Sequence, residues 1–312
     1  MLKCLISLGL VTTALLGSLG IVSAASYSLV SNNPTEIENI IVQADANSYN
    51  TYMSRGVSKL EQKKYSAAVE DFNNAIRLNP DEARAYFGRG LAFSALEDYQ
   101  KAIEDFSQVI RLQPPNTPQA WAYDERGYVY YILDKYPEGL EDFNQAINLK
   151  PDYTDAYYHR SHVYYALGNY QQAIDDLSQV IQKAPKFACA YNNRCYYRAR
   201  GLKDYQGAIE DCNQALRLDS QTANFYSSRC YVRANLGDQK ALEDCARAFK
   251  IAPNKAGTYE DRGLAHLALG DKQRAIEDLQ KAAELYRQRK DNQSYQKVMK
   301  IIDQIQLKPT TF

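Results

Sequence analysis

The chain of 312 residues is poor in several residue types that enzymes and metal sites depend on. It has three histidines, three methionines and one tryptophan, and its 37 basic side chains are balanced by 37 acidic ones. A net charge of zero argues against a polybasic nucleic-acid binder, and a hydrophobic share of 45% is too high for a disordered tail. We therefore expect a folded protein whose partners do not include nucleic acid.

Motifs for catalysis and cofactor binding are also missing from the sequence. It contains no glycine-rich phosphate loop, no nucleophile elbow and no zinc-protease motif. His159 and His162 lie three residues apart on one predicted helix. They would bind a metal only if carboxylates converged on them, so a plain pair facing a groove is the favoured interpretation. The sequence predicts no catalytic residue, no metal site and no cofactor, and hence a protein that is not an enzyme.

The first 24 residues form a segment of their own. Lys3 precedes a run from Cys4 to Val22 that carries no charged, amide or aromatic side chain. The small residues that end at Ala24 match the site that a signal peptidase cleaves, so residues 1–24 are predicted to be a signal peptide. The run is also just long enough to span a bilayer, so an uncleaved membrane anchor is the alternative. Either interpretation places the rest of the chain outside the cytoplasm, in a periplasm, a lumen or the external medium.

A pattern with a period near 34 residues organises the remainder of the chain. Its first block is Tyr-x-x-Arg followed by glycine, serine or cysteine. Its second block is a small residue, an apolar residue, two acidic residues and another apolar residue, as in Ala68 to Phe72. Both blocks place apolar or small residues at spacings of three, four and seven, which indicates amphipathic helices. Five copies close with a proline, which marks the end of the second helix. Each copy is therefore a helix hairpin, and stacked hairpins build one continuous core.

This pattern resembles the tetratricopeptide repeat. The shared features are the length of 34, a small residue at position eight, alanine at positions 20 and 27, an aromatic residue at 24 and proline at 32. The resemblance covers residues 49–289 and implies an all-α solenoid, a right-handed superhelix of helix hairpins with a C-terminal capping helix. Departures are three extra residues near 117–119, one extra near Gly201, one missing near Asp238, and no closing proline in the fifth and seventh copies.

The repeat also sets the expected boundaries. Residues 25–48 form a polar lead-in with one short helix near 35–45, and residues 290–312 form the capping helix and tail. The seven units are 49–82, 83–116, 120–153, 154–187, 188–222, 223–255 and 256–289.

Every copy has an arginine at position seven and an aspartate at position 23, both at the edge of the helix packing. A charge in such a place needs a partner, because burying it alone costs several kcal/mol. We therefore predict a ladder of arginine–aspartate pairs within or between neighbouring copies. The alternative is a basic track for an anionic ligand, which would need arginines without matched acids.

The five cysteines after the first segment all lie in the fifth and sixth copies. Cys195 and Cys230 occupy position eight, while Cys212 and Cys245 occupy position 24. Because these positions lie level on facing helices, we predict the bonds Cys195–Cys212 and Cys230–Cys245, each worth about 3 kcal/mol. The alternatives are a Cys212–Cys230 bond and four reduced core cysteines. Cys189 is left free or paired with another chain.

In this repeat family, ligands contact first-helix positions two, five, six, nine, twelve and thirteen on the concave face. In the middle copies of this chain, those positions include Trp121, Asp124, Glu125, Tyr128, Tyr131, Tyr158, His159, His162, Tyr165, Asn192, Asn193, Tyr196, Arg200 and Tyr231. The resemblance thus implies an aromatic groove suited to an extended peptide or a proline-rich segment. The family's clamp for a terminal carboxylate is not expected, because Met53 and Val57 occupy clamp positions. Some of the tyrosines are expected to pack against neighbours instead.

The predicted function is a non-catalytic scaffold that binds a protein or peptide segment outside the cytoplasm. The alternative is an accessory or assembly subunit of an envelope or membrane enzyme complex. Contact with a membrane is expected only if the first segment is retained as an anchor.

Overall fold

The computed structural model describes residues 34–112 and 119–307, and within these ranges it contains helices and no strand. The elements are α2 (Pro34–Glu61), α3 (Tyr65–Leu78), α4 (Ala83–Ala95), α5 (Tyr99–Leu112), α6 (Gln119–Ile132), α7 (Tyr136–Leu149), α8 (Thr154–Ala166), α9 (Tyr170–Lys183), α10 (Ala188–Tyr197), the π turn η1 (Arg198–Leu202), α11 (Tyr205–Leu218), α12 (Ala223–Asn235), α13 (Ala241–Ile251), α14 (Ala256–Ala268), α15 (Lys272–Gln288) and α16 (Asn292–Leu307). The predicted all-α fold is confirmed.

The predicted signal peptide or anchor, residues 1–24, lies outside the described residues. None of the helices that the structure does describe is long and apolar enough to cross a bilayer.

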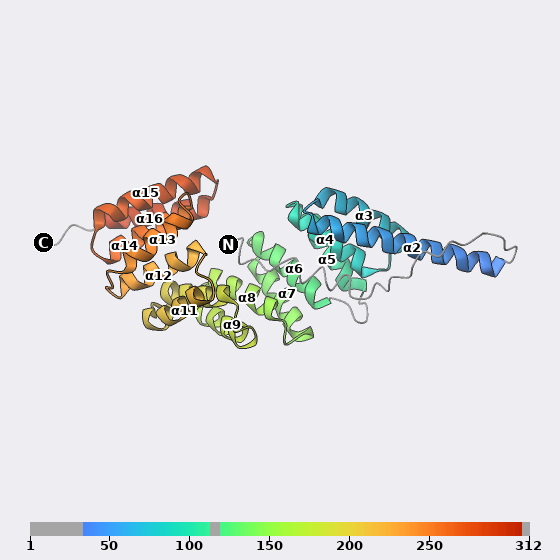
Figure 1. Cartoon of the computed structure of the whole chain (residues 1–312), viewed down its shortest axis with the longest axis horizontal. Helices are drawn as coiled ribbons and strands as arrows, with labels where there is room; N and C mark the ends of the chain where they lie inside the picture. The colour runs from blue at the N-terminus through green and yellow to red at the C-terminus, as the bar shows by residue number, and fades with distance from the viewer. Residues whose placement is uncertain (1–33, 113–118, 308–312) are drawn as a thin grey trace. The chain divides into compact units, whose positions relative to one another are not determined.

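The helices group into two compact units, Met1–His159 and Arg160–Phe312, which we describe separately. In the N-terminal unit α2 packs on α3, α3 on α4 and α4 on α5, and these four helices lie side by side in Figure 1. In the C-terminal unit α10 packs on α11, α11 on α12 and α12 on α13, and α14 packs on α15. Consecutive antiparallel hairpins therefore build each unit, as the repeat pattern predicts.

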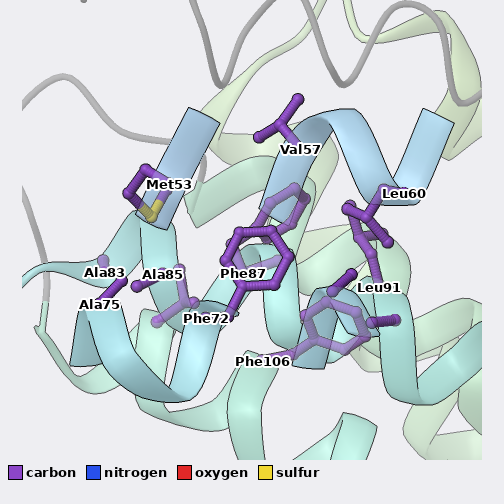
Figure 2. Close-up of a cluster of buried hydrophobic side chains, with 14 of the residues drawn as sticks. Met53, Val57, Leu60, Phe72, Ala75, Ala83, Ala85, Phe87, Leu91 and Phe106 are labelled. Carbon is purple, nitrogen blue, oxygen red and sulfur yellow. The ribbon is translucent and has the colours of Figure 1, made fainter. Parts of the chain in front are cut away.

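Phenylalanine rings from the second helices form the core of the N-terminal unit. Phe72 and Phe106 are fully buried, and Figure 2 shows them among side chains of α2 and α4. Each ring lies on the position-eight glycine of its own copy. A Cβ added to Gly56 would lie 2.7 Å from the Phe72 ring, and one added to Gly90 would lie 2.8 Å from the Phe106 ring. Position eight is small because the ring at position 24 needs the space.

Disulfides replace this ring-on-glycine contact in the fifth and sixth copies. The structure pairs Cys195 with Cys212 and Cys230 with Cys245, with the Cα atoms of each pair 5.4 Å apart. All four cysteines are buried, and the alternative Cys212–Cys230 bond is not formed. The described part of the chain holds no free cysteine, so the first of the two options for Cys189, a free thiol, is wrong.

The arginine ladder is present in all seven copies. In the second to seventh copies, Nε and Nη2 of the position-seven arginine donate to both carboxylate oxygens of the position-23 aspartate in the same copy, at 2.5–2.9 Å. In the first copy, Nη2 of Arg55 lies 3.1 Å from Asp71. All seven aspartates are buried, so these arginines serve packing and are not a track for an anionic ligand.

The ladder also joins neighbouring copies and involves several of the 26 tyrosines of the chain. Nη1 of Arg126 donates to Ser107 of the preceding copy at 2.8 Å, and Arg89 reaches Asn73 in the same way at 2.6 Å. In six copies the position-four tyrosine lies 5.5–5.9 Å from the arginine's Cζ, within cation–π range.

Irregularities in repeat length appear as local changes of the helices. The inserted residue near Gly201 is taken up by η1, after which Lys203 has a left-handed φ of 59°. The residue missing near Asp238 accompanies a shorter second helix, since α13 has 11 residues where α3 has 14. In the seventh copy, α15 continues for 17 residues.

The two ends of the repeat array differ in how well the sequence predicts them. The capping helix is confirmed as α16, which buries Val298 and Ile302 against Leu279 of α15. The lead-in does not end near residue 48, because α2 runs from Pro34 without a break into the first copy. No proline or glycine interrupts the chain between Pro34 and Gly56, and proline is well tolerated in the first turn of a helix.

Candidate binding face

The candidate site is the set of first-helix residues at positions two, five, six, nine, twelve and thirteen, which we call the first-helix face. Of the fourteen predicted contact residues, four are buried, namely Asp124, Tyr158, Asn192 and Tyr231. The other ten are partly exposed, namely Trp121, Glu125, Tyr128, Tyr131, His159, His162, Tyr165, Asn193, Tyr196 and Arg200. These ten present some surface to a partner in this conformation.

Asp124 is the centre of the face in the N-terminal unit. Its Oδ1 lies 3.0 Å from His159 Nδ1, and its Oδ2 accepts a hydrogen bond of 3.1 Å from the Tyr153 hydroxyl. The His159 ring lies 4.9 Å from the ring of Tyr128, whose other aromatic neighbour is Tyr131 at 6.3 Å. This arrangement fixes His159 between an acid and an aromatic ring, so Asp124 and His159 serve the structure of the face.

Two more acids, Glu125 and Asp155, lie beside Asp124. Burial and then the charge of Asp124 raise the pKa of Glu125 to about 7 and that of Asp155 to about 6. Burial opposes the charged form of His159, but the neighbouring Asp124 outweighs it and raises the pKa of His159. The N-terminal face therefore gains negative charge as the pH rises through 6 to 7.

Trp121 is attached to the core as well as to the face. It packs on the cluster that contains Ala146, Tyr153 and Ala156, and the Lys150 ammonium lies 5.6 Å from its ring centroid. The indole is therefore held by the core and remains partly exposed.

The face of the C-terminal unit is largely filled by its own side chains. Tyr165 stacks on Tyr197 with ring centroids 4.1 Å apart and lies 5.7 Å from Tyr196. His162 Nε2 and Asn193 Nδ2 are 3.3 Å apart, which places His162 in a side-chain network. No group of histidine, cysteine, aspartate and glutamate within the described residues could hold a metal ion.

Arg200, carried by η1, crosses this face to reach α14. Its Nη2 donates to Asp261 at 2.7 Å, and its Nη1 lies 3.7 Å from Glu260. The guanidinium carbon lies 4.2 Å from the centroid of Tyr231 and 5.3 Å from that of Tyr196. Burial raises the pKa of Asp261 to about 6 even though Arg200 opposes that shift.

The sequence prediction missed several residues of these networks. Glu260 and Asp261 occupy positions five and six of the seventh copy, so the family's contact positions identify them once they are applied beyond the middle copies. Tyr153 lies at the last position of its copy, and Lys297 lies in the capping helix, 3.3 Å from Glu260. No contact position of the repeat covers either of them.

Comparisons with known proteins agree with this architecture. Family models described as tetratricopeptide repeat match residues 53–117, 154–187 and 256–289, and one described as TPR repeat matches residues 127–168. Together the matches cover about half of the chain and lie in both units. A search of curated proteins found no match.

Solved structures resemble the chain in fold. A tetratricopeptide repeat protein from Parabacteroides merdae has a TM-score of 0.62 at 19% identity, over 81% of this chain and 99% of that one. PilF from Pseudomonas aeruginosa has a TM-score of 0.61 at 14% identity, over 70% of this chain and 98% of that one. The Cut9–Hcn1 hetero-tetramer of the APC/C has a TM-score of 0.62 at 21% identity, over 76% of this chain but only 46% of that one. At these identities the likeness concerns the fold alone.

Proposed function

We propose that this chain, which belongs to the tetratricopeptide repeat family, is a non-catalytic scaffold that holds an extended segment of another protein against its first-helix face, outside the cytoplasm. Protein binding is the usual role of the family. The finer statements, the groove and the compartment, rest on the side chains described above.

The observation that carries the proposal is the pair of partly exposed tyrosines on α6. Tyr128 and Tyr131 lie at positions nine and twelve of one helix, with their ring centroids 6.3 Å apart, and Glu125 lies one turn before Tyr128. Tyrosine rings offer apolar contact at low entropic cost, and their hydroxyl tips hydrogen-bond to a peptide main chain. Such a row suits an extended segment better than a compact small molecule.

The test is capture of a protein partner by the immobilised full-length chain, with the captured proteins identified by mass spectrometry. Replacing Tyr128 and Tyr131 together by alanine should abolish capture, because both rings are lost from the face. Tyr123→Ala is the matched control, since Tyr123 lies on the same helix but at position four, beside Arg126 and away from the face. The control should keep capture; if capture persists in the double variant, the tyrosine row is not the site.

The two disulfides support a location outside the cytoplasm. Bonds of this kind form and persist in oxidising compartments and are rare where thiols are kept reduced. Thiol labelling of the unfolded protein, taken directly from cells, should modify Cys195, Cys212, Cys230 and Cys245 only after reduction. Labelling before reduction would contradict the proposed compartment. Stoichiometric isolation with several proteins of one membrane complex would instead favour the accessory-subunit role.

A further inference from the structure

The side chain of Arg200 occupies a cage built from three elements of the C-terminal unit. The cage consists of two rings and two carboxylates, those of Tyr196, Tyr231, Glu260 and Asp261. The guanidinium lies over the Tyr231 ring and pairs with Asp261, and only 10% of the Arg200 side chain is exposed. The chain therefore shows directly that this cage accepts a guanidinium group.

Arg200 also covers a position that the repeat pattern assigns to ligand contact. Tyr231 is at position nine of the sixth copy, yet it is only 7% exposed, and Arg200 is the cation over its ring. Asp261 is 61 residues further along the chain than Arg200, so this contact links the fifth copy to the seventh across the sixth. A partner that used this part of the face would have to move Arg200.

Arg200 is held less completely than the arginines of the ladder. Its Nε has no hydrogen-bond partner within the described residues although it is buried, and an unsatisfied buried donor costs about 1–3 kcal/mol. Most ladder arginines, by contrast, donate from both Nε and Nη2 to one carboxylate. Arg200 is also carried by a π turn that absorbs an inserted residue, and such turns are local departures from stable α-helix.

We propose that the cage is a binding site for an arginine side chain of the partner segment, and that Arg200 is its internal occupant, which the partner's arginine displaces. This inference rests on the proposed function and names the chemistry of the partner. With Arg200 withdrawn, the cage has two carboxylates, while Lys297 remains as the cation beside Glu260. One negative charge is then left for the incoming group. A planar guanidinium suits the cage better than an ammonium, because it stacks on Tyr231 while its Nη2 donates to Asp261 and its Nη1 lies near Glu260.

The test uses the full-length chain and two small probes, N-acetyl-arginine amide and its neutral isostere N-acetyl-citrulline amide. In Arg200→Ala the cage is empty, whereas in the unchanged chain Arg200 itself competes for the cage at a millimolar effective concentration. Calorimetry should therefore show that arginine amide binds Arg200→Ala at least about tenfold more tightly than it binds the unchanged chain. Arg217→Ala is the matched control, because Arg217 is an exposed arginine of the same unit and its loss should leave binding as in the unchanged chain. Citrulline amide should bind Arg200→Ala at least about tenfold more weakly than arginine amide does, because it lacks the charge.

Further variants locate the site. Adding Asp261→Asn to Arg200→Ala should remove the gain in affinity, because the carboxylate that accepts the hydrogen bond from the guanidinium is gone. If circular dichroism shows that Arg200→Ala does not fold, Arg200→Gln takes its place. Equal binding by the unchanged chain and the variant, equal binding of the two probes, or a gain that survives Asp261→Asn would each overturn the inference.

The outcomes for the cage and for the proposed function are separable. If arginine amide does not enter the cage while capture of a protein still depends on Tyr128 and Tyr131, the cage inference fails and the scaffold stands. If arginine amide binds Arg200→Ala while capture does not depend on those tyrosines, the tyrosine row fails as the docking site and the cage remains.

Discussion

The ring-on-glycine contact and the disulfide occupy the same two repeat positions, so one should substitute for the other. We predict that Cys195→Gly with Cys212→Phe rebuilds the contact that Gly90 and Phe106 make in the second copy. The partner helices already approach closely enough in this hairpin, because the Cα atoms of the two cysteines are 5.4 Å apart.

The expected change in the free energy of unfolding follows from what the disulfide and the ring-on-glycine contact each contribute. The bond joins residues with a separation of 17, for which loop entropy corresponds to about 3 kcal/mol. A fully buried phenylalanine contributes about 1.5–3 kcal/mol, and glycine inside a helix costs about 1 kcal/mol. The Gly–Phe variant should therefore be about 1–2.5 kcal/mol less stable than the oxidised chain, and more stable than the chain whose disulfides are reduced.

These differences in stability are measured by urea unfolding, followed by circular dichroism, with and without reductant. Addition of reductant should destabilise the unchanged chain and have a smaller effect on the Gly–Phe variant, which keeps the sixth-copy disulfide but lacks the fifth-copy one. The matched control is Cys195→Ala with Cys212→Ala, which lacks both the bond and the ring. If the Gly–Phe variant is no more stable than this alanine pair under either condition, the ring does not replace the disulfide and the equivalence of the two contacts is wrong.

Three further predictions concern the ladder, the turns and the acids of the first-helix face. Arg160→Ala should destabilise the chain by about 3–5 kcal/mol in urea unfolding, because it leaves the buried Asp176 without its bidentate partner, and an unchanged midpoint would contradict the ladder. Glu97 has a φ of 62°, so Glu97→Gly should raise the melting temperature by relieving about 1 kcal/mol of strain, whereas Gly168→Ala at φ 79° should lower it. Because the pKa of Glu125 is raised to about 7 in the folded chain, its contribution to stability is present below about pH 4 and is lost as the pH rises through 7. In urea unfolding at pH 8, Glu125→Gln should thus be more stable than the unchanged chain by about 1–2 kcal/mol, allowing for the partial exposure of this group. This advantage should disappear at pH 4. A difference in stability that does not change with pH would refute the raised pKa of Glu125.

Features that repeat with the period of the helix hairpin could be predicted from the sequence. A glycine at position eight and a ring at position 24 recur at a fixed spacing, and the spacing of a hairpin determines that they meet. The same holds for Arg126 and Asp142, and for the four cysteines that replace the glycine and the ring.

Features that depend on one copy only could not be predicted in this way. The pairing of Arg200 with Asp261 joins residues 61 apart and depends on the π turn at an irregular position, which no repeat consensus describes. The covering of Tyr231 follows from that pairing, so a position that the family uses for ligands is buried here. Periodicity identifies the side of a helix on which a residue lies, but not which side chain from another copy will cover it.

The disulfides also determine what a protease could release from this chain. The exposed turn after η1 contains Lys203, which lies between Cys195 and Cys212, and the turn before α13 contains the exposed Lys240, between Cys230 and Cys245. After a cut at either lysine, the disulfide would still join the two fragments covalently. They would run as one band on a non-reducing gel and separate into two bands only after reduction. A cut at the turn before α7, in the N-terminal unit, would leave α6 and α7 joined by packing alone.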